Sequence, residues 1–257
     1  MADYFRTADD FREQNGYTID ELWYPIVTRI VSIKSKPGLE NFYREVGGYA
    51  NGRAIADRSA DEGALVHEAA EALLLGQEKD VDASIAPSIA AFRNFMDAHV
   101  IKTEPEFVER RVYHNDHRYA GTVDALVTMD GKFGVLDIKT SQSIYRDYNL
   151  QTAAYMEALT GQFPSIETRW ILRLDQNQKC ARCPAVRRIK GGREKIRGAN
   201  GHSPFGAPCE EHEWRETEGI AELKEFPVWQ DDFAAFLGAK KLWEWENNEW
   251  LRRIGYL

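Results

Sequence analysis

The chain has 257 residues, long enough for one large domain or a domain with an insertion, and a formal net charge of −8. This acidic balance argues against a protein that simply coats nucleic acid, but not against an enzyme that acts on it, because local patches of charge decide such contacts. No apolar run approaches the roughly 20 residues that span a bilayer. With three cysteines and a polar start unlike a leader, we expect a cytoplasmic protein with no membrane partner.

The apolar periodicity predicts helices alternating with strands. Helices are expected over residues 4–14, 39–58, 60–75, 84–99, 148–159 and 231–252, and strands over 106–113, 118–129, 132–139 and 166–174. The helix over 60–75 is expected to begin at a capping box, with Ser59 as N-cap and Glu62 at the third helical position. The order helix, three strands, helix, strand predicts an α/β fold with a mixed central sheet flanked by helices.

Residues 121–139 carry the strongest functional signal. Asp130-Gly131, between two apolar runs, predicts a hairpin that sets Asp124 across from Asp137. Side chains alternate along a strand, so Asp137 and Lys139 should project on the same side. Carboxylates this close repel each other unless a cation lies between them, and hard oxygen ligands suit Mg²⁺ or Mn²⁺. Taken alone, the Asp-Ile-Lys tripeptide is most often a solvated strand end, but here it follows a strongly apolar run.

Candidate partners lie on either side of this hairpin. His67 and Glu71 are four residues apart on one helix and share a face. A lone helical histidine is usually structural, but a neutral imidazole among carboxylates makes a reasonable Mn²⁺ ligand. Glu71 either supports the ligands, binds a second metal ion or lies on a solvated face. Gln151 and Tyr155 are likewise four apart, and either contact a phosphate, hold Lys139 in place or are ordinary surface residues.

Glu109 lies in a predicted strand beside two arginines. It is either an outer carboxylate of the same site or half of a salt bridge.

The region from 176 to 212 changes character and reads as a basic insertion between the core segments 1–175 and 213–257. Cys180-x-x-Cys183 and Cys209-x-x-His212 form a Cys₃His set that fits a closed tetrahedral zinc site, a zinc-ribbon-like insertion. His202 is a substitute ligand, and free thiols in a loop are the alternative.

Residues 179–197 carry eight Lys and Arg against one Glu, a balance of +7 in an acidic chain. A basic loop on a zinc scaffold suits contact with phosphates, and a flexible linker is the alternative. The candidate DNA-binding residues are Arg187, Arg188, Lys190, Arg193, Lys195 and Arg197. The aromatic stripe of the last predicted helix is expected to pack against the core rather than to stack on bases.

Together these motifs resemble the RecB-like branch of the PD-(D/E)XK nuclease superfamily. The matching segments, within residues 22–175, are YPIVTRIVSIKSKPGLENFY, GALVHEAAE, GTVD, LDIKTS and QTAAY. The first also resembles phage and plasmid members and the mitochondrial genome maintenance exonuclease. Members with an iron–sulfur cluster carry one cysteine before the core and three after it, whereas this chain has none before Cys180.

The resemblance implies a restriction-endonuclease-like core and a metal bound by His67, Asp124, Asp137 and the backbone carbonyl of Ile138. It also implies that Lys139 lies near the attacking water and that Gln151 and Tyr155 position the substrate strand. The expected function is Mg²⁺- or Mn²⁺-dependent DNA cleavage, most often by an exonuclease of recombination, repair or phage replication, with structural zinc in the insertion.

The expected partners are single- or double-stranded DNA and a recombinase or single-strand-binding protein, and a bacterial, phage or plasmid origin is compatible with this. The alternatives are a nuclease-fold DNA-binding or adaptor protein without turnover, and a zinc-ribbon interaction module whose nuclease motifs arose by chance.

Overall fold

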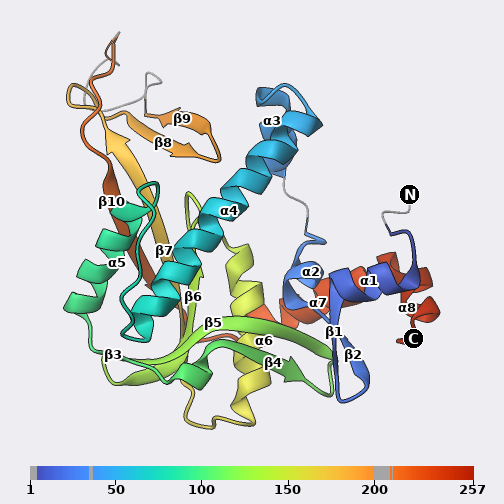
Figure 1. Ribbon diagram of the computed structural model, residues 1–257. Coiled ribbons are helices and arrows are strands. Elements are labelled where there is room, and N and C mark those ends of the chain that lie inside the picture. The colour runs from blue at the N-terminus through green and yellow to red at the C-terminus, as the bar shows by residue number, and fades with distance from the viewer. Residues whose placement is uncertain (1–4, 35–36, 199–208, 210) are drawn as a thin grey trace.

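The computed structural model describes residues 5–34, 37–198, 209 and 211–257 (Figure 1). His202 lies outside the described residues. Within them, eight strands form one mixed sheet in the order β3-β5-β6-β7-β8-β9, with β4 paired to β5 and β10 paired to β7. These strands are β3 (Ile101–Lys102), β4 (Val108–His114), β5 (Tyr119–Met129), β6 (Lys132–Lys139), β7 (Thr168–Lys179), β8 (Val186–Lys190), β9 (Arg193–Arg197) and β10 (Glu218–Glu225). A separate hairpin pairs β1 (Gly16–Ile19) with β2 (Leu22–Pro25).

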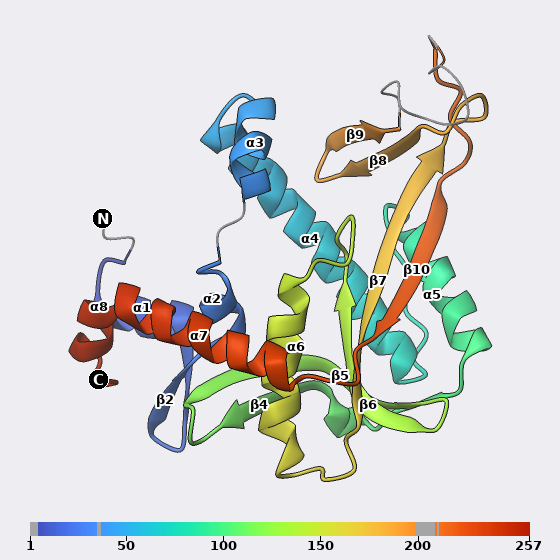
Figure 2. The same ribbon diagram turned by 180° about the vertical axis from the view of Figure 1, so that it is seen from behind.

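Helices cover both faces of the sheet, as predicted. They are α1 (Ala8–Asn15), α2 (Val27–Val31), α3 (Pro37–Glu45), α4 (Tyr49–Leu74), α5 (Ala86–Ala98), α6 (Asp147–Thr160), α7 (Gln230–Glu246) and α8 (Asn248–Arg253), with a 3₁₀ turn over Pro105–Phe107. Helices α4 and α5 lie on one face, and α6 lies with α7 on the other (Figures 1 and 2). The mixed α/β class is therefore confirmed.

Two hydrophobic cores follow from strand alternation in β5 and β6. Leu126 and Val135 belong to the core under α6 and α7, whereas Val127 and Leu136 belong to the core under α4 and α5. Strands β5 and β6 are therefore nearly continuous apolar runs in the sequence, as expected for strands that are buried on both faces.

Strands β6 and β7 are parallel, and α6 makes the crossover between them. Asp137 and Lys139, at the carboxyl end of β6, therefore lie just before the loop that enters α6. This connection places the predicted hairpin and the predicted Gln151–Tyr155 helix beside each other.

The predicted turn of this hairpin is confirmed. Asp130 and Gly131 both adopt positive φ, 51° and 89°, and the register pairs Met129 with Lys132. Positive φ at both central positions defines a type I′ turn, which matches the twist of the flanking strands.

The predicted capping box is wrong. Helix α4 begins at Tyr49 and runs through Ser59, whose hydroxyl donates to the Ile55 carbonyl at 2.7 Å. Glu62 instead accepts a hydrogen bond from the backbone N–H of Gly191. Glu62, which the local pattern assigned to a helix start, therefore makes a tertiary contact with a residue far along the chain, and Ser59 lies inside the helix.

The C-terminal segment forms two helices rather than the single predicted one, with the break at Asn247. The expected packing of its aromatic stripe is confirmed for Phe236 and Trp243, which are buried in the core with α6, whereas Trp245 is 70% exposed. Among the described residues, no helix combines the length and the apolar character that crossing a bilayer needs.

Candidate functional site

The β5–β6 hairpin brings the two predicted carboxylates together. Ala125 pairs with Leu136, so Asp124 and Asp137 are the next residues in register. The backbone N–H of Ile138 donates to Asp124 Oδ2 at 2.6 Å. Lys139 Nζ lies 2.6 Å from Asp137 Oδ2, so these two side chains do project on the same side.

Burial makes this group of charges electrostatically unfavourable in isolation. Asp137 is 1% exposed. Burial raises the pKa of Asp124 and of Asp137 to about 6, although the Lys139 ammonium opposes the rise in both. Burial alone would lower the pKa of Lys139, but the two carboxylates outweigh it and raise that pKa above its ordinary value. One ammonium near two largely buried carboxylates leaves a net negative site, which favours a further cation.

Helix α4 brings His67 to the same place. Its Nδ1 lies 3.7 Å from Asp124 Oδ2. Burial, together with the Lys139 ammonium, lowers the pKa of His67 to about 4, so its imidazole is neutral near pH 7 and keeps a free lone pair. This is the state in which histidine ligates a metal.

Glu71 lies one turn further along α4 and is protonated more readily than an ordinary glutamate. Burial and the neighbouring Glu109 carboxylate raise its pKa to about 7. Glu109 has a φ of 49°, a left-handed conformation within β4. Such backbone strain clusters at functional sites. No ion pair involves Glu109 within the described residues, so its salt-bridge alternative finds no support.

Helix α6 contributes from the other side. Gln151 Nε2 donates to Asp137 Oδ1 at 3.3 Å and to Tyr155 Oη at 3.1 Å. Tyr155 is 1% exposed and packs in the core, so of this pair it is Gln151 that reaches the site. Its contact there is with the Asp137 carboxylate and not with Lys139. Gly121 allows this packing, because a Cβ there would lie 2.5 Å from the Tyr155 ring.

Tyr148 is a site residue that the sequence analysis missed. The Lys139 ammonium lies 5.3 Å from the centre of its ring. Tyr148, Gln151 and Tyr155 are spaced i, i+3, i+7 on α6, the spacing of one helical face, and that pattern could have revealed it.

One observation supports a divalent cation bound by His67, Asp124 and Asp137, and another argues against it. Asp137 Oδ2 is buried and, although 2.6 Å from Lys139 Nζ, receives no hydrogen bond of good geometry, so a lone pair remains available. The ligand atoms of His67, Asp124 and Asp137 do not all lie within 4.8 Å of one another. The donors are therefore of the right chemistry for Mg²⁺ or Mn²⁺, but as placed they do not form a coordination shell.

The four predicted zinc ligands do come together. Cys180, Cys183, Cys209 and His212 have ligand atoms within 4.8 Å of one another, the one such group of three or more His, Cys, Asp or Glu in the described part of the chain. Cys209 Sγ lies 3.7 Å from Cys180 Sγ, 3.4 Å from Cys183 Sγ and 3.1 Å from His212 Nδ1. A zinc–sulfur bond of about 2.3 Å in a tetrahedron implies ligand separations of about 3.8 Å. This Cys₃His group can therefore bind a metal such as zinc.

The zinc-ligand group is built onto the end of a core strand. Strand β7 continues through Lys179, beyond the expected start of the insertion at 176, and Cys180 forms a bridge with Trp214. The β8–β9 hairpin begins three residues after Cys183, so this group lies at the base of the hairpin.

The predicted DNA-binding residues divide between the two faces of that hairpin. Arg188 lies opposite Lys195, and Lys190 lies opposite Arg193, so these four cations share one face. Arg187 lies on the other face, over the Trp214 ring, and pairs with Glu194. Arg197, at the end of β9, is exposed.

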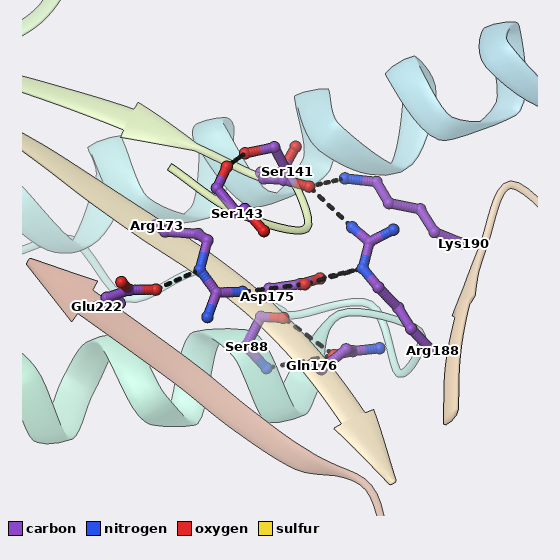
Figure 3. A network of polar contacts seen from close by, with 10 residues as sticks. Ser88, Ser141, Ser143, Arg173, Asp175, Gln176, Arg188, Lys190 and Glu222 are labelled. Carbon is purple, nitrogen blue, oxygen red and sulfur yellow. Dashed lines mark hydrogen bonds and ion pairs between the residues drawn. The ribbon is translucent and has the colours of Figure 1, made fainter. Parts of the chain in front are cut away.

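A polar network joins this hairpin to the loop after β6 (Figure 3). The buried carboxylate of Asp175 accepts from Arg188 Nε at 2.8 Å and from Arg173 at 3.2 Å. Arg188 also donates to the Thr140 carbonyl at 3.1 Å, and Lys190 donates to the same oxygen. The residue after Lys139 is thereby fixed by side chains some fifty positions further along the chain.

No protein-family model and no curated protein matches this chain.

Proposed function

We propose that this protein is a Mg²⁺- or Mn²⁺-dependent deoxyribonuclease with a RecB-like PD-(D/E)XK core. The observation that carries the proposal is the buried Asp137, which has Lys139 at 2.6 Å, follows Asp124 in the hairpin register and receives Gln151 from the next helix. A structural ion pair needs one carboxylate. Two largely buried carboxylates, a lysine and a neutral histidine are a set that can hold a divalent cation and stabilise the charge that develops in phosphodiester hydrolysis.

The ligands proposed for the metal are Asp124, Asp137, His67 and the carbonyl of Ile138, with Glu71 as support or as a ligand of a second ion. A bound Mg²⁺ or Mn²⁺ polarises a phosphate and lowers the pKa of a coordinated water. A histidine ligand beside carboxylates favours Mn²⁺ over Mg²⁺.

The other side chains have roles that follow from their contacts. Lys139, whose ammonium lies beside Asp137, would stabilise the attacking water or the developing phosphate charge. Gln151 holds Asp137 in place, and Tyr155 holds Gln151. Tyr148 lies beside the Lys139 ammonium and limits where it can move. A catalytic group held by its neighbours in this way loses little freedom on reaching the transition state.

We propose DNA as the substrate, with removal of nucleotides from an end as the mode of cleavage and a recombinase or single-strand-binding protein as a partner. The rival proposal is a nuclease-fold protein that binds DNA without cutting it. Asp124, Asp137 and Lys139 are all present, which favours an enzyme over the rival. A protein that only binds DNA has no use for a buried lysine beside two carboxylates.

Lys139→Met separates the enzyme from this rival. We expect DNA cleavage in Mn²⁺ to fall by about 10²–10³-fold, because a positioned charge is lost from the transition state. Mn²⁺ affinity should be unchanged or tighter, because the ammonium no longer competes for Asp137. Cleavage is measured as acid-soluble nucleotide release, and Mn²⁺ binding by calorimetry.

A thermal melt in Mn²⁺ confirms that the variant is folded, and Lys132→Met, at the exposed start of the same strand, serves as the matched control. Equal cleavage by Lys139→Met and the unaltered protein would contradict the role of Lys139. No cleavage by either, with DNA still bound, would favour the rival.

A further inference from the structure

A groove runs from the candidate metal site to the underside of the β8–β9 hairpin. A cavity of about 440 Å³ reaches His67, Lys139, Tyr145 and Tyr148. A second cavity, of about 200 Å³, reaches Phe42, Ile55, Arg193 and Lys195. Both are lined by Ser59, Gln142, Arg188 and Lys190, so they adjoin and form one path, which we call the hairpin groove.

The walls of the hairpin groove are fixed by contacts with α4. The hairpin tip donates from Gly191 N–H to Glu62 at 2.9 Å and accepts from Arg58 at 3.0 Å. A Cβ at Gly191 would lie 2.2 Å from the Ser59 hydroxyl, so this close approach requires glycine. The hairpin groove is therefore formed before any ligand arrives.

Like charges face each other across the hairpin. Arg188 is directly opposite Lys195, and Lys190 is directly opposite Arg193. Such cross-strand pairs are destabilising unless anions lie beside them. Burial lowers the pKa of Lys190 to about 8, and the Arg188 charge adds to this effect.

The protein supplies only some of the anions that this face requires. Asp175 pairs with Arg188, and Glu45 pairs with Arg193. Lys190 donates to a carbonyl, and Lys195 has no ion-pair partner in the described part of the chain. A chain whose net charge is −8 thus holds a face of four cations, two of which line the same cavity as His67 and Lys139.

Aromatic rings lie along the same path. Phe42 lies 5.0 Å beneath the Arg193 guanidinium, and Tyr145 is 47% exposed beside Tyr148. Cations spaced along a groove with aromatic rings between them are the features that bind single strands without regard to sequence. The cavity of about 440 Å³ beside Lys139 falls within the range of small-ligand sites, so it has room for a single nucleotide.

We propose that the hairpin groove binds the phosphate backbone of single-stranded DNA beside the scissile phosphate, with Lys190, Arg193 and Lys195 as the phosphate contacts. This inference rests on the proposed nuclease function, whose substrate it narrows to a single strand. It also gives the zinc-ligand group a role, because that group fixes the start of the hairpin.

The test is binding of a fluorescein-labelled oligothymidylate to the full-length protein in EDTA, over a range of salt concentrations, followed by anisotropy. Arg193→Ala/Lys195→Ala should weaken binding by about tenfold or more at low salt and reduce the slope of log affinity against log salt by roughly 1.4. Lys195→Ala alone should give about half that change in slope. Lys224→Ala/Lys241→Ala removes two exposed lysines elsewhere and is the charge-matched control.

Single-strand affinity that is equal in the double variant and the control would overturn the inference. An equal loss for a duplex of the same length would also overturn it, because the groove would then not be specific to single strands. Hydrolysis of bis(p-nitrophenyl) phosphate by the unaltered protein in Mn²⁺ tests the metal site separately, because the cavity at that site is not lined by Arg193 or Lys195, the two residues that the double variant changes. If the unaltered protein does not hydrolyse this diester but the double variant loses single-strand binding, the nuclease proposal is contradicted and the inference about the groove is retained.

Discussion

Asp137→Asn is expected to reduce Mn²⁺-dependent DNA cleavage by roughly 10³-fold or more. An amide has the shape of the carboxylate but cannot supply the negative charge that holds a divalent cation, and the loss of the cation removes both phosphate polarisation and the activated water. Cleavage is measured as release of labelled nucleotides from linear DNA.

The variant is expected to fold. The pKa of Asp137 is raised to about 6, above its ordinary value, so its contribution to stability is present below about pH 4 and is lost as pH rises through 6. At pH 8 a neutral side chain should therefore not lower the unfolding temperature in EDTA.

Asp130→Asn is the matched control, because it alters an aspartate at the turn of the same hairpin, where asparagine also tolerates positive φ. Cleavage by Asp137→Asn at the level of this control would show that the carboxylate does not hold a catalytic metal.

Cys183→Ser is expected to remove bound zinc and to unfold the β8–β9 hairpin locally. Structural zinc in small modules contributes on the order of 10 kcal/mol to folding, far more than a two-stranded hairpin can supply. Bound zinc is measured by elemental analysis, and amide hydrogen exchange should lose protection over residues 186–197 while β5 and β6 keep theirs.

Chelation of the unaltered protein should reproduce this loss, and added zinc, unlike added magnesium, should reverse it. Full protection of the hairpin in zinc-free Cys183→Ser would mean that the ligand group does not organise this segment.

Much of the candidate site was predictable because its determinants are local. The Asp130-Gly131 turn sets the register by itself, and that register places Asp124 next to Asp137. Strand alternation then puts Lys139 on the side of Asp137. The Cys₃His group was likewise readable, since ligand type and spacing alone suggest it.

The rest depends on contacts between segments far apart in the sequence. Ser59 and Glu62 have the local chemistry of a helix start, yet the approach of Gly191 gives Glu62 a different partner. The link from Asp175 through Arg188 to Thr140 joins three elements, and no spacing in the sequence indicates it. Strand alternation within β8 and β9 could have separated Arg187 from the other cations, but only once their pairing was known.

The most direct test of the nuclease proposal is digestion of end-labelled linear single-stranded, linear double-stranded and circular DNA by the unaltered protein, in Mn²⁺ and in EDTA. We predict that linear single strands are degraded from an end in Mn²⁺, that circles stay intact, and that EDTA abolishes the reaction. Intact DNA of every form in Mn²⁺, from protein that is folded and binds the ion, would contradict the proposal.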